Sequence, residues 1–170
     1  MANHRYQFQL AQSQQEIQAY FDLRQTIFCH EQKLFTGHDQ DDVDSIAHPI
    51  VAVDTEASNL VVGVVRIYEQ QSRLWYGGRL GVHPNYRRVG RIGKGLIYKA
   101  VTTANTWGCD RFLATVQQQN VRFFQRQHWH SLEQLMVRGH PHHLMEADLA
   151  FYPSCSLSEI PHLPLVTRKN

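Results

Sequence analysis

A glycine-rich, cationic segment, residues 79–101 (RLGVHPNYRRVGRIGKGLIYKAV), has residue types and a spacing suited to binding phosphate. Gly90, Gly93 and Gly95 fall where a strand ending at Val82 gives way to a helix. Glycine lets backbone amides approach a ligand closely, and a helix N-terminus favours an anion by about 0.3–1 kcal/mol per contact. The same stretch carries Arg87, Arg88, Arg91 and Lys94. We therefore predict a phosphate or pyrophosphate site, with an ordinary helix start and solvated arginines as the alternative.

Two familiar phosphate loops do not fit this segment. A P-loop needs GxxxxGK followed by Ser or Thr, and a dinucleotide fingerprint needs GxGxxG in a parallel strand–helix–strand unit, with an acidic residue about 20 positions later. Residues 79–101 contain neither pattern. The predicted elements also disagree, because hairpin strands precede this helix in place of alternating strands and helices.

A second group of charged residues lies nearer the start of the chain. Residues 36–45 (TGHDQDDVDS) contain Asp39, Asp41, Asp42 and Asp44, which could also form a merely solvated turn. Arg24 falls within a helical apolar stripe of Ile17, Phe21, Ile27 and Phe28. A guanidinium on an apolar face needs an acidic partner unless its charged end reaches the edge of the core. Both readings of Arg24 stay open.

The elements that position these groups are predicted from apolar periodicity. Tyr6, Phe8 and Leu10 alternate as in a strand, and Ser13 followed by Glu16 indicates a helix start. Residues 49–53, 60–66 and 74–82 predict an antiparallel meander, and residues 111–116 and 120–127 predict a strand and a short helix. The helix after the glycines should bury Leu96, Ile97, Ala100, Val101 and Ala104. A last strand is predicted by alternation at Met145, Ala147, Leu149 and Phe151.

The composition indicates one globular domain over residues 1–153, with an irregular tail over 154–170. The chain has 170 residues, 42% hydrophobic and 19% charged, and a net charge of +2 that implies no nucleic-acid partner. No apolar run approaches the roughly 20 residues of a membrane span. Because the start does not look like a secretory signal, we expect a cytoplasmic protein.

Cysteine and histidine spacing predicts no metal site. Cys29, Cys109 and Cys155 are odd in number and widely separated, so we expect free thiols. His140, His142 and His143 lie together in GHPHHLM. Adjacent histidines on a strand face opposite sides, which is poor geometry for one metal ion, so a solvated loop is the preferred interpretation.

Residues 80–96 (LGVHPNYRRVGRIGKGL) resemble the acyl-CoA-binding motif of the GCN5-related N-acetyltransferases, and Asn120 to Trp129 (N..FF....W) is similar to that family's following motif. The resemblance spans nearly the whole domain, and a narrower likeness is to a cyanobacterial-type subgroup associated with nitrogen starvation. It implies an α+β fold, with a mixed, mostly antiparallel twisted sheet flanked by helices and splayed next to the strand ending at Val82. It further implies that acetyl-CoA is bound by Leu80, Gly81, Val82, Arg87, Arg88, Val89, Gly90, Arg91, Ile92, Gly93, Lys94, Asn120, Phe123 and Phe124.

The chain departs from the family pattern at three positions. Ile92 stands where a second small residue is expected, so the pyrophosphate contacts would shift by one residue. Phe124 replaces a tyrosine that often protonates the leaving thiolate, and Gly78 replaces a glutamate that often acts as base. A carboxylate acting through water is then needed to take the amine proton. Glu31, Asp41 and Asp44 are candidates, each with a structural or substrate-charge role as the alternative, and Glu31 and Asp44 are our catalytic predictions.

The front of the chain is similar to the acyl-homoserine lactone synthases, relatives of the acetyltransferases. The similarity rests on Arg24, Phe28, Asp41, Asp44 and Arg66, and it implies that Arg24, Asp44 and Arg66 interact. In that case Arg24, Phe28, Asp41 and Arg66 bind an ammonium or carboxylate of the acceptor. Leu34 and Phe35 occupy the region where those synthases carry a tryptophan.

The overall expectation is therefore an enzyme that moves an acetyl group to the amine of a small molecule. Lactone-signal synthesis is the alternative among enzymes. A non-catalytic acyl-CoA-binding regulatory domain is the alternative outside them, because both usual proton-transfer residues are missing. The oligomeric state is open, with a homodimer as one arrangement.

Overall fold

The fold begins with a strand and a capped helix, as expected. In the computed structural model, which describes residues 4–155, β1 spans Tyr6–Leu10 and α1 spans Gln14–Arg24. The Ser13 hydroxyl accepts a hydrogen bond from the Glu16 amide at 3.1 Å, which satisfies one of the free amides of the first turn. The helical path then widens into a π-helical segment, Gln25–Glu31, which the sequence did not predict.

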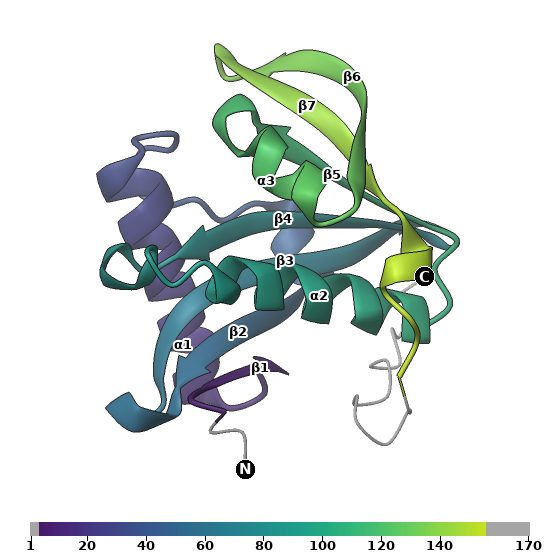
Figure 1. Ribbon diagram of the computed structural model, residues 1–170. Helices are drawn as coiled ribbons and strands as arrows, with labels where there is room; N and C mark the ends of the chain where they lie inside the picture. Colours follow the sequence, from purple (N-terminus) through teal and green to yellow (C-terminus); the bar gives the residue numbers. More distant parts are fainter. Residues whose placement is uncertain (1–3, 156–170) are drawn as a thin grey trace, which may run out of the picture.

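A single seven-stranded sheet forms the centre of the domain, in the order β1-β2-β3-β4-β5-β7-β6 (Figure 1). The remaining strands are β2 (His48–Asp54), β3 (Leu60–Gln71), β4 (Leu74–Val82), β5 (Arg111–Gln117), β6 (Trp129–Val137) and β7 (His140–Ala147). All neighbouring pairs are antiparallel except β4 and β5, which are parallel. The predicted α+β fold with a mostly antiparallel sheet is confirmed.

The junction between β4 and β5 is only partly paired. Register partners run from Leu74 opposite Arg111 to Gly77 opposite Ala114, and no pair is formed beyond them in the described chain. The last residues of β4 therefore diverge from Thr115, Val116 and Gln117 of β5. We call this open part of the junction the seam; its position matches the expected splay.

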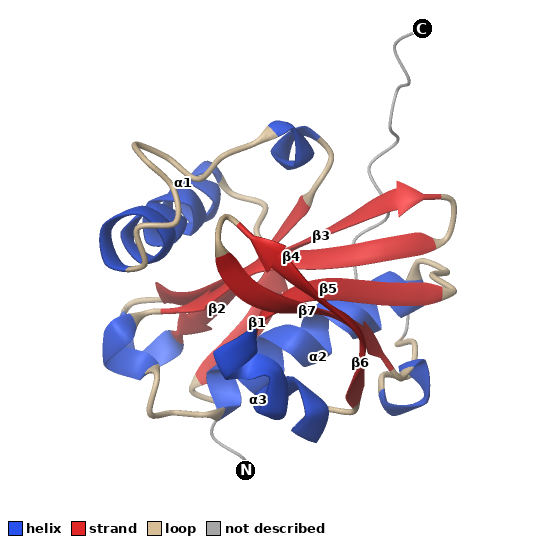
Figure 2. Cartoon of the chain, turned by 90° about the horizontal axis from the view of Figure 1, so that it is seen from above, coloured by secondary structure: helices blue, strands red, loops and turns tan. Residues whose placement is uncertain are grey.

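Helices cover both faces of the sheet. Figure 2 shows α1 on one face and α2 (Arg91–Thr106) with α3 (Val121–Arg126) on the other. The face of α2 predicted to be apolar is buried against the sheet, where each large aliphatic side chain contributes roughly 1.5–3 kcal/mol. Position 95 of this helix has to be glycine, because a Cβ there would come within 2.2 Å of the Phe8 ring. Its role is therefore to let β1 pack on α2.

The C-terminal hairpin differs from the sequence prediction. β6 was not predicted, because its side chains are mostly exposed and leave no alternating apolar pattern. The last strand begins at His140 and ends at Ala147, whereas Leu149–Phe151 forms a 3-10 turn capped by the Asp148 side chain. The expected solvated histidine loop is therefore wrong: His140, His142 and His143 belong to β7.

Four further features concern the cysteines, membrane helices, metal clusters and the C-terminal tail. Cys29, Cys109 and Cys155 are free thiols, as expected. In the described part of the chain, no helix has the length and apolar character to cross a membrane, and no cluster of three or more His, Cys, Asp or Glu side chains could hold a metal ion. Most of the predicted tail, 154–170, lies outside the described residues.

Candidate active site

A cavity of about 290 Å³ opens at the seam. Gly78 and Leu80 of β4 line one side, and Thr115 and Gln117 of β5 line the other. Aromatic side chains from the π-helical segment, the following loop and α3 complete its wall: Phe28, Phe35 and Phe124. The cavity thus has an apolar body with polar groups at the open end of the seam, as small-molecule sites commonly do.

The start of α2, where an anion site was predicted, has backbone amides that are free to bind a ligand. Within residues 4–155, the amides of Arg88, Gly90, Arg91 and Gly93 have no hydrogen-bond acceptor, as is usual for a first helical turn. A Cβ at Gly90 would meet no atom within 4 Å, so this backbone is open to a ligand. Ile92 points the other way, because its side chain is fully buried in the core.

Arg87 is engaged elsewhere, although the sequence assigned it to the cofactor. Its guanidinium pairs with both carboxylate oxygens of Glu31, with 2.8 Å from Nη2 to Oε2, and its Nε donates to the Val82 carbonyl at 3.0 Å. The hydrogen bond from Arg87 lowers the pKa of Glu31. This pair therefore anchors the π-helical segment to the turn before α2, and it leaves Glu31 a weak base.

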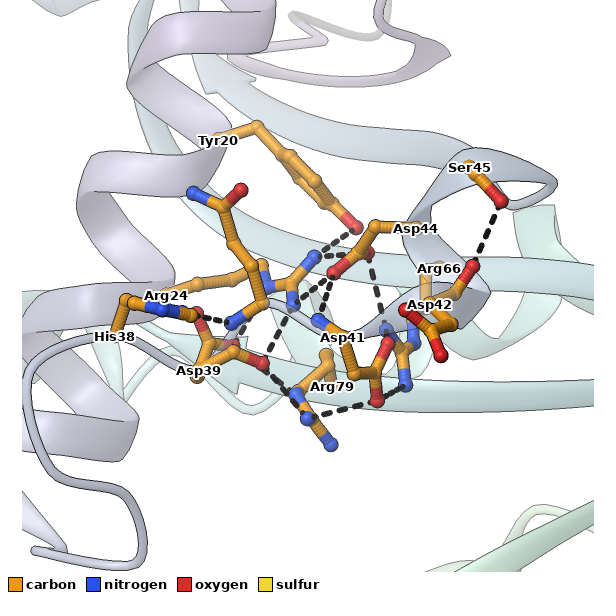
Figure 3. Close-up of polar contacts among 11 residues, drawn as sticks. Tyr20, Arg24, His38, Asp39, Asp41, Asp42, Asp44, Ser45, Arg66 and Arg79 are labelled. Carbon is orange, nitrogen blue, oxygen red and sulfur yellow. Dashed lines mark hydrogen bonds and ion pairs between the residues drawn. The ribbon is translucent and has the colours of Figure 1, made fainter.

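Six side chains, which we call the arginine–aspartate cluster, lie between α1 and the sheet (Figure 3): Arg24, Arg66, Arg79, Asp39, Asp41 and Asp44. Arg24 donates to Asp39 at 2.7 Å and to Asp44 at 2.7 Å and 3.1 Å. Arg66 donates to Asp41 at 2.7 Å and 3.0 Å and to Asp44 at 3.0 Å. The expected contact among Arg24, Asp44 and Arg66 is present, and the three cations balance the three anions.

Arg24 is completely buried, so the alternative in which its charged end reaches the edge of the core is wrong. Its guanidinium also donates to the Tyr20 hydroxyl at 3.0 Å. Burial raises the pKa of Tyr20 to about 12, so this phenol stays neutral. A buried guanidinium is tolerated only when its donors are satisfied, which explains why the loop carrying the aspartates folds back over α1.

Asp44 is held in its ionised form by these contacts. Burial alone would raise the pKa of this carboxyl, but hydrogen bonds from Arg24, the Asp41 amide and Arg66 outweigh it and lower the pKa to about 2. The carboxylate is a poor proton acceptor at neutral pH for the same reason. The geometry favours a charge-balancing role for Asp44 over that of a general base.

Arg79 was not singled out from the sequence. It sits on a β-bulge of β4 with a φ of +52°, and its Nε donates to Asp39 at 3.0 Å. Its guanidinium carbon lies 4.4 Å from the centre of the Phe35 ring, and that of Arg138 lies 4.2 Å from the same ring. Both arginines line the cavity. The sequence did hold a signal for Arg79: it is a charged residue in a strand whose neighbouring positions Trp75 and Leu80 are apolar.

His142 is a second residue that sequence reasoning missed. It is 7% exposed, lines the cavity, and its Nδ1 lies 2.9 Å from the His140 carbonyl. Adjacent His143 faces the other side of β7, where its Nδ1 lies 2.8 Å from the Ser131 hydroxyl. His142 was missed because the segment was interpreted as a loop, where no side chain has a defined direction.

Of the three positions that depart from the family pattern, Phe124 and Gly78 line the cavity, whereas Ile92 lies in the core. Phe124 is buried with its ring edge-to-face against Trp129, at 5.1 Å between centroids. A Cβ at Gly78 would lie in ordinary van der Waals contact, 3.7 Å from the Arg66 Nε. Asn120 also lines the cavity, whereas Phe123 packs beside Gly93, 3.4 Å from an ideal Cβ.

Known proteins share this architecture. A protein described as an N-acetyltransferase of Lactobacillus plantarum is 19% identical, with a TM-score of 0.73 over 84% of this chain and 97% of the other. Escherichia coli ElaA is 21% identical, with a TM-score of 0.69 over 84% and 98%. BjaI, a CoA-dependent acyl-homoserine lactone synthase crystallised with SAM and isopentyl-CoA, is 15% identical, with a TM-score of 0.65 over 80% and 78%. At these identities the likeness concerns the fold.

Family membership rests on sequence. No curated protein sequence matches the chain significantly. The model of the acetyltransferase (GNAT) family matches residues 11–129, well over half of the chain. The matched region runs from the end of β1 to Trp129 and so includes the seam and the start of α2. The chain therefore belongs to the GNAT family of acetyltransferases.

Proposed function

We propose that this protein transfers an acetyl group from acetyl-CoA to the amine of a small molecule. The observation that carries the proposal is that α2 contributes to both parts: its start has open amides, and Ile97, Ala100 and Val101 further along it line the cavity at the seam. The amides of Arg88, Gly90, Arg91 and Gly93 suit a pyrophosphate, and the seam suits an extended pantetheine arm. When bound, acetyl-CoA supplies an activated thioester.

The residues around the seam supply positioning. The bulge at Arg79 interrupts the pairing of β3 with β4 and frees backbone groups near Leu80 for a ligand. The Val82 carbonyl already accepts a hydrogen bond from Arg87. We therefore assign the backbone amide of Val82 to the thioester. Holding the amine and the thioester in a reactive orientation in one cavity can contribute up to roughly 7–11 kcal/mol towards the barrier.

The cavity lining bears on the acceptor class. Among the described residues that line it are Arg66, Arg79 and Arg138, and none is an aspartate or glutamate. The described lining therefore offers no carboxylate to pair with the ammonium ions of a polyamine. We assign the acceptor to amines that carry a carboxylate, which Arg138, the lining arginine outside the charge-balanced arginine–aspartate cluster, would attract. The sequence left open whether the pocket binds an ammonium or a carboxylate of the acceptor, and this assignment selects the carboxylate.

The remaining sequence predictions concern the catalytic carboxylates, the alternative reaction, the subgroup, the location and the oligomeric state. Glu31 and Asp44 are each held by arginines, which disfavours the catalytic roles first assigned to them and favours charge balance. Lactone synthesis is the second candidate, supported by the contact among Arg24, Asp44 and Arg66. The nitrogen-starvation subgroup, the cytoplasmic location and a homodimer stay predictions.

An acceptor panel tests the proposal. Release of free thiol from acetyl-CoA would be followed with glycine, β-alanine and 4-aminobutyrate, with the amides of these acids, and with spermidine. We expect an amino acid to raise release well above hydrolysis, whereas its amide and spermidine do not. Protection against thermal unfolding by CoA without acceptor-dependent release would favour the regulatory domain. A preference for a longer acyl donor would favour the synthase.

A further inference from the structure

We infer that His142 is the general base of this site: its Nε2 takes the proton from the acceptor amine. The inference rests on the proposed acyl transfer. It starts from the groups that line the cavity and can titrate, which in the described chain are Arg66, Tyr68, Tyr76, Arg79, Arg138 and His142. Arginine and tyrosine side chains hold their protons at neutral pH. His142 is thus the one proton acceptor among these lining residues.

The hydrogen bond at Nδ1 prepares His142 for this role. A carbonyl oxygen can only accept, so the contact of 2.9 Å with His140 places the hydrogen on Nδ1. In the neutral ring Nε2 then carries a lone pair. Within residues 4–155 Nε2 has no hydrogen-bond partner and is not among the unpartnered side-chain atoms sealed from solvent, so it keeps access to solvent in a residue that lines the cavity.

The register of the sheet brings His142 to the correct end of the seam. His142 is opposite Gln117 on β5, beyond Ala114, where pairing with β4 stops. Side chains of Gln117 and His142 share one face of the sheet, and both line the cavity. That face is also the one on which Arg66 projects.

The proton transfer balances without another reactant. The amine nitrogen forms a bond to the carbonyl carbon of the acetyl group, and the bond from that carbon to sulfur breaks. His142 Nε2 takes the proton that the nitrogen loses, and the imidazolium then returns it through solvent to the departing thiolate.

Two matched variants test the inference. His142→Gln keeps a polar side chain without a base, and His143→Gln makes the same change on the opposite face of β7. With acetyl-CoA and the best acceptor of the panel, we expect His142→Gln to lower kcat by about 10²–10⁴-fold and to remove the acidic limb of the pH profile. CoA affinity should not change, and His143→Gln should match the wild type in all three measurements.

A measurement independent of turnover completes the test. Nitrogen-15 NMR of the histidine rings should show His142 protonated at Nδ1 and unprotonated at Nε2 at neutral pH. The opposite tautomer would overturn the inference, as would a His142→Gln protein that keeps the wild-type rate and acidic limb. If the wild type itself releases no thiol with any acceptor, the proposed function fails, and the assignment of a general base fails with it.

Discussion

Replacing Asp44 by asparagine is the most direct perturbation of the arginine–aspartate cluster. The Asp44 carboxylate accepts from Arg24 at 2.7 Å and 3.1 Å, from Arg66 at 3.0 Å and from the Asp41 amide at 3.1 Å. Asparagine keeps one acceptor oxygen and presents an NH₂ group to a guanidinium. Among residues 4–155, Arg24, which is fully buried, would then keep Asp39 as its one anionic partner.

The magnitude follows from the pKa of Asp44, which the fold lowers from 3.8 to about 2. At about 1.4 kcal/mol per pKa unit, the ionised carboxylate contributes roughly 2 kcal/mol to the free energy of unfolding at pH 7. Because the folded-state pKa is depressed, this contribution is complete above pH 4 and is lost as the pH falls towards 2. About half of it should be gone at pH 3.

Urea unfolding at pH 7, 5 and 3 measures this effect. Asp44→Asn should be about 2 kcal/mol less stable than the wild type at pH 7, and the difference should shrink by about 1 kcal/mol at pH 3. Asp42→Asn is the matched control, because Asp42 is an exposed neighbour. A difference that does not change with pH, or one no larger than that of the control, would refute the reasoning.

Three further predictions concern packing, the anion site and the thiols. Gly95→Ala should lower stability by about 1–3 kcal/mol in urea unfolding, because its Cβ would lie 2.2 Å from the Phe8 ring. Gly90→Ala, which meets open space, is the control and should change stability little. In calorimetry, Gly90→Asp should weaken CoA binding about fivefold relative to Gly90→Asn, because it sets a carboxylate against the pyrophosphate. Burial raises the pKa of Cys109 to about 11, so a thiol reagent at pH 8 should modify Cys155 first and spare Cys109 until the protein unfolds.

Local patterns identified most of the fold. Helix α2 and strands β1 to β5 were predicted because each element is buried on one face or along most of its length. Such burial leaves a clear apolar pattern in the sequence. Strand β6 was missed because its side chains are mostly exposed. The predicted strand at Leu149 and Phe151 was wrong because the alternation continued by chance into a turn capped by Asp148.

The site was harder to predict than the fold. A likeness to a known motif located the start of α2, but ion pairing depends on which segments meet in space. Arg87 reads as a phosphate ligand in sequence, whereas 56 positions separate it from its partner Glu31. Asp39 reads as a solvated turn residue, yet it is 1% exposed and pairs with Arg24 and Arg79. Such partners are set by the tertiary fold.

The short pairing between β4 and β5 also makes the stability of the domain depend on occupancy. Four residue pairs connect the strands that precede the seam to those that follow it. A bound molecule that hydrogen-bonds both edges would supply contacts that the interrupted ladder lacks. Strands β5 to β7 would then open less often relative to β1 to β4, and their amide hydrogens would exchange more slowly, even at positions that never touch the molecule.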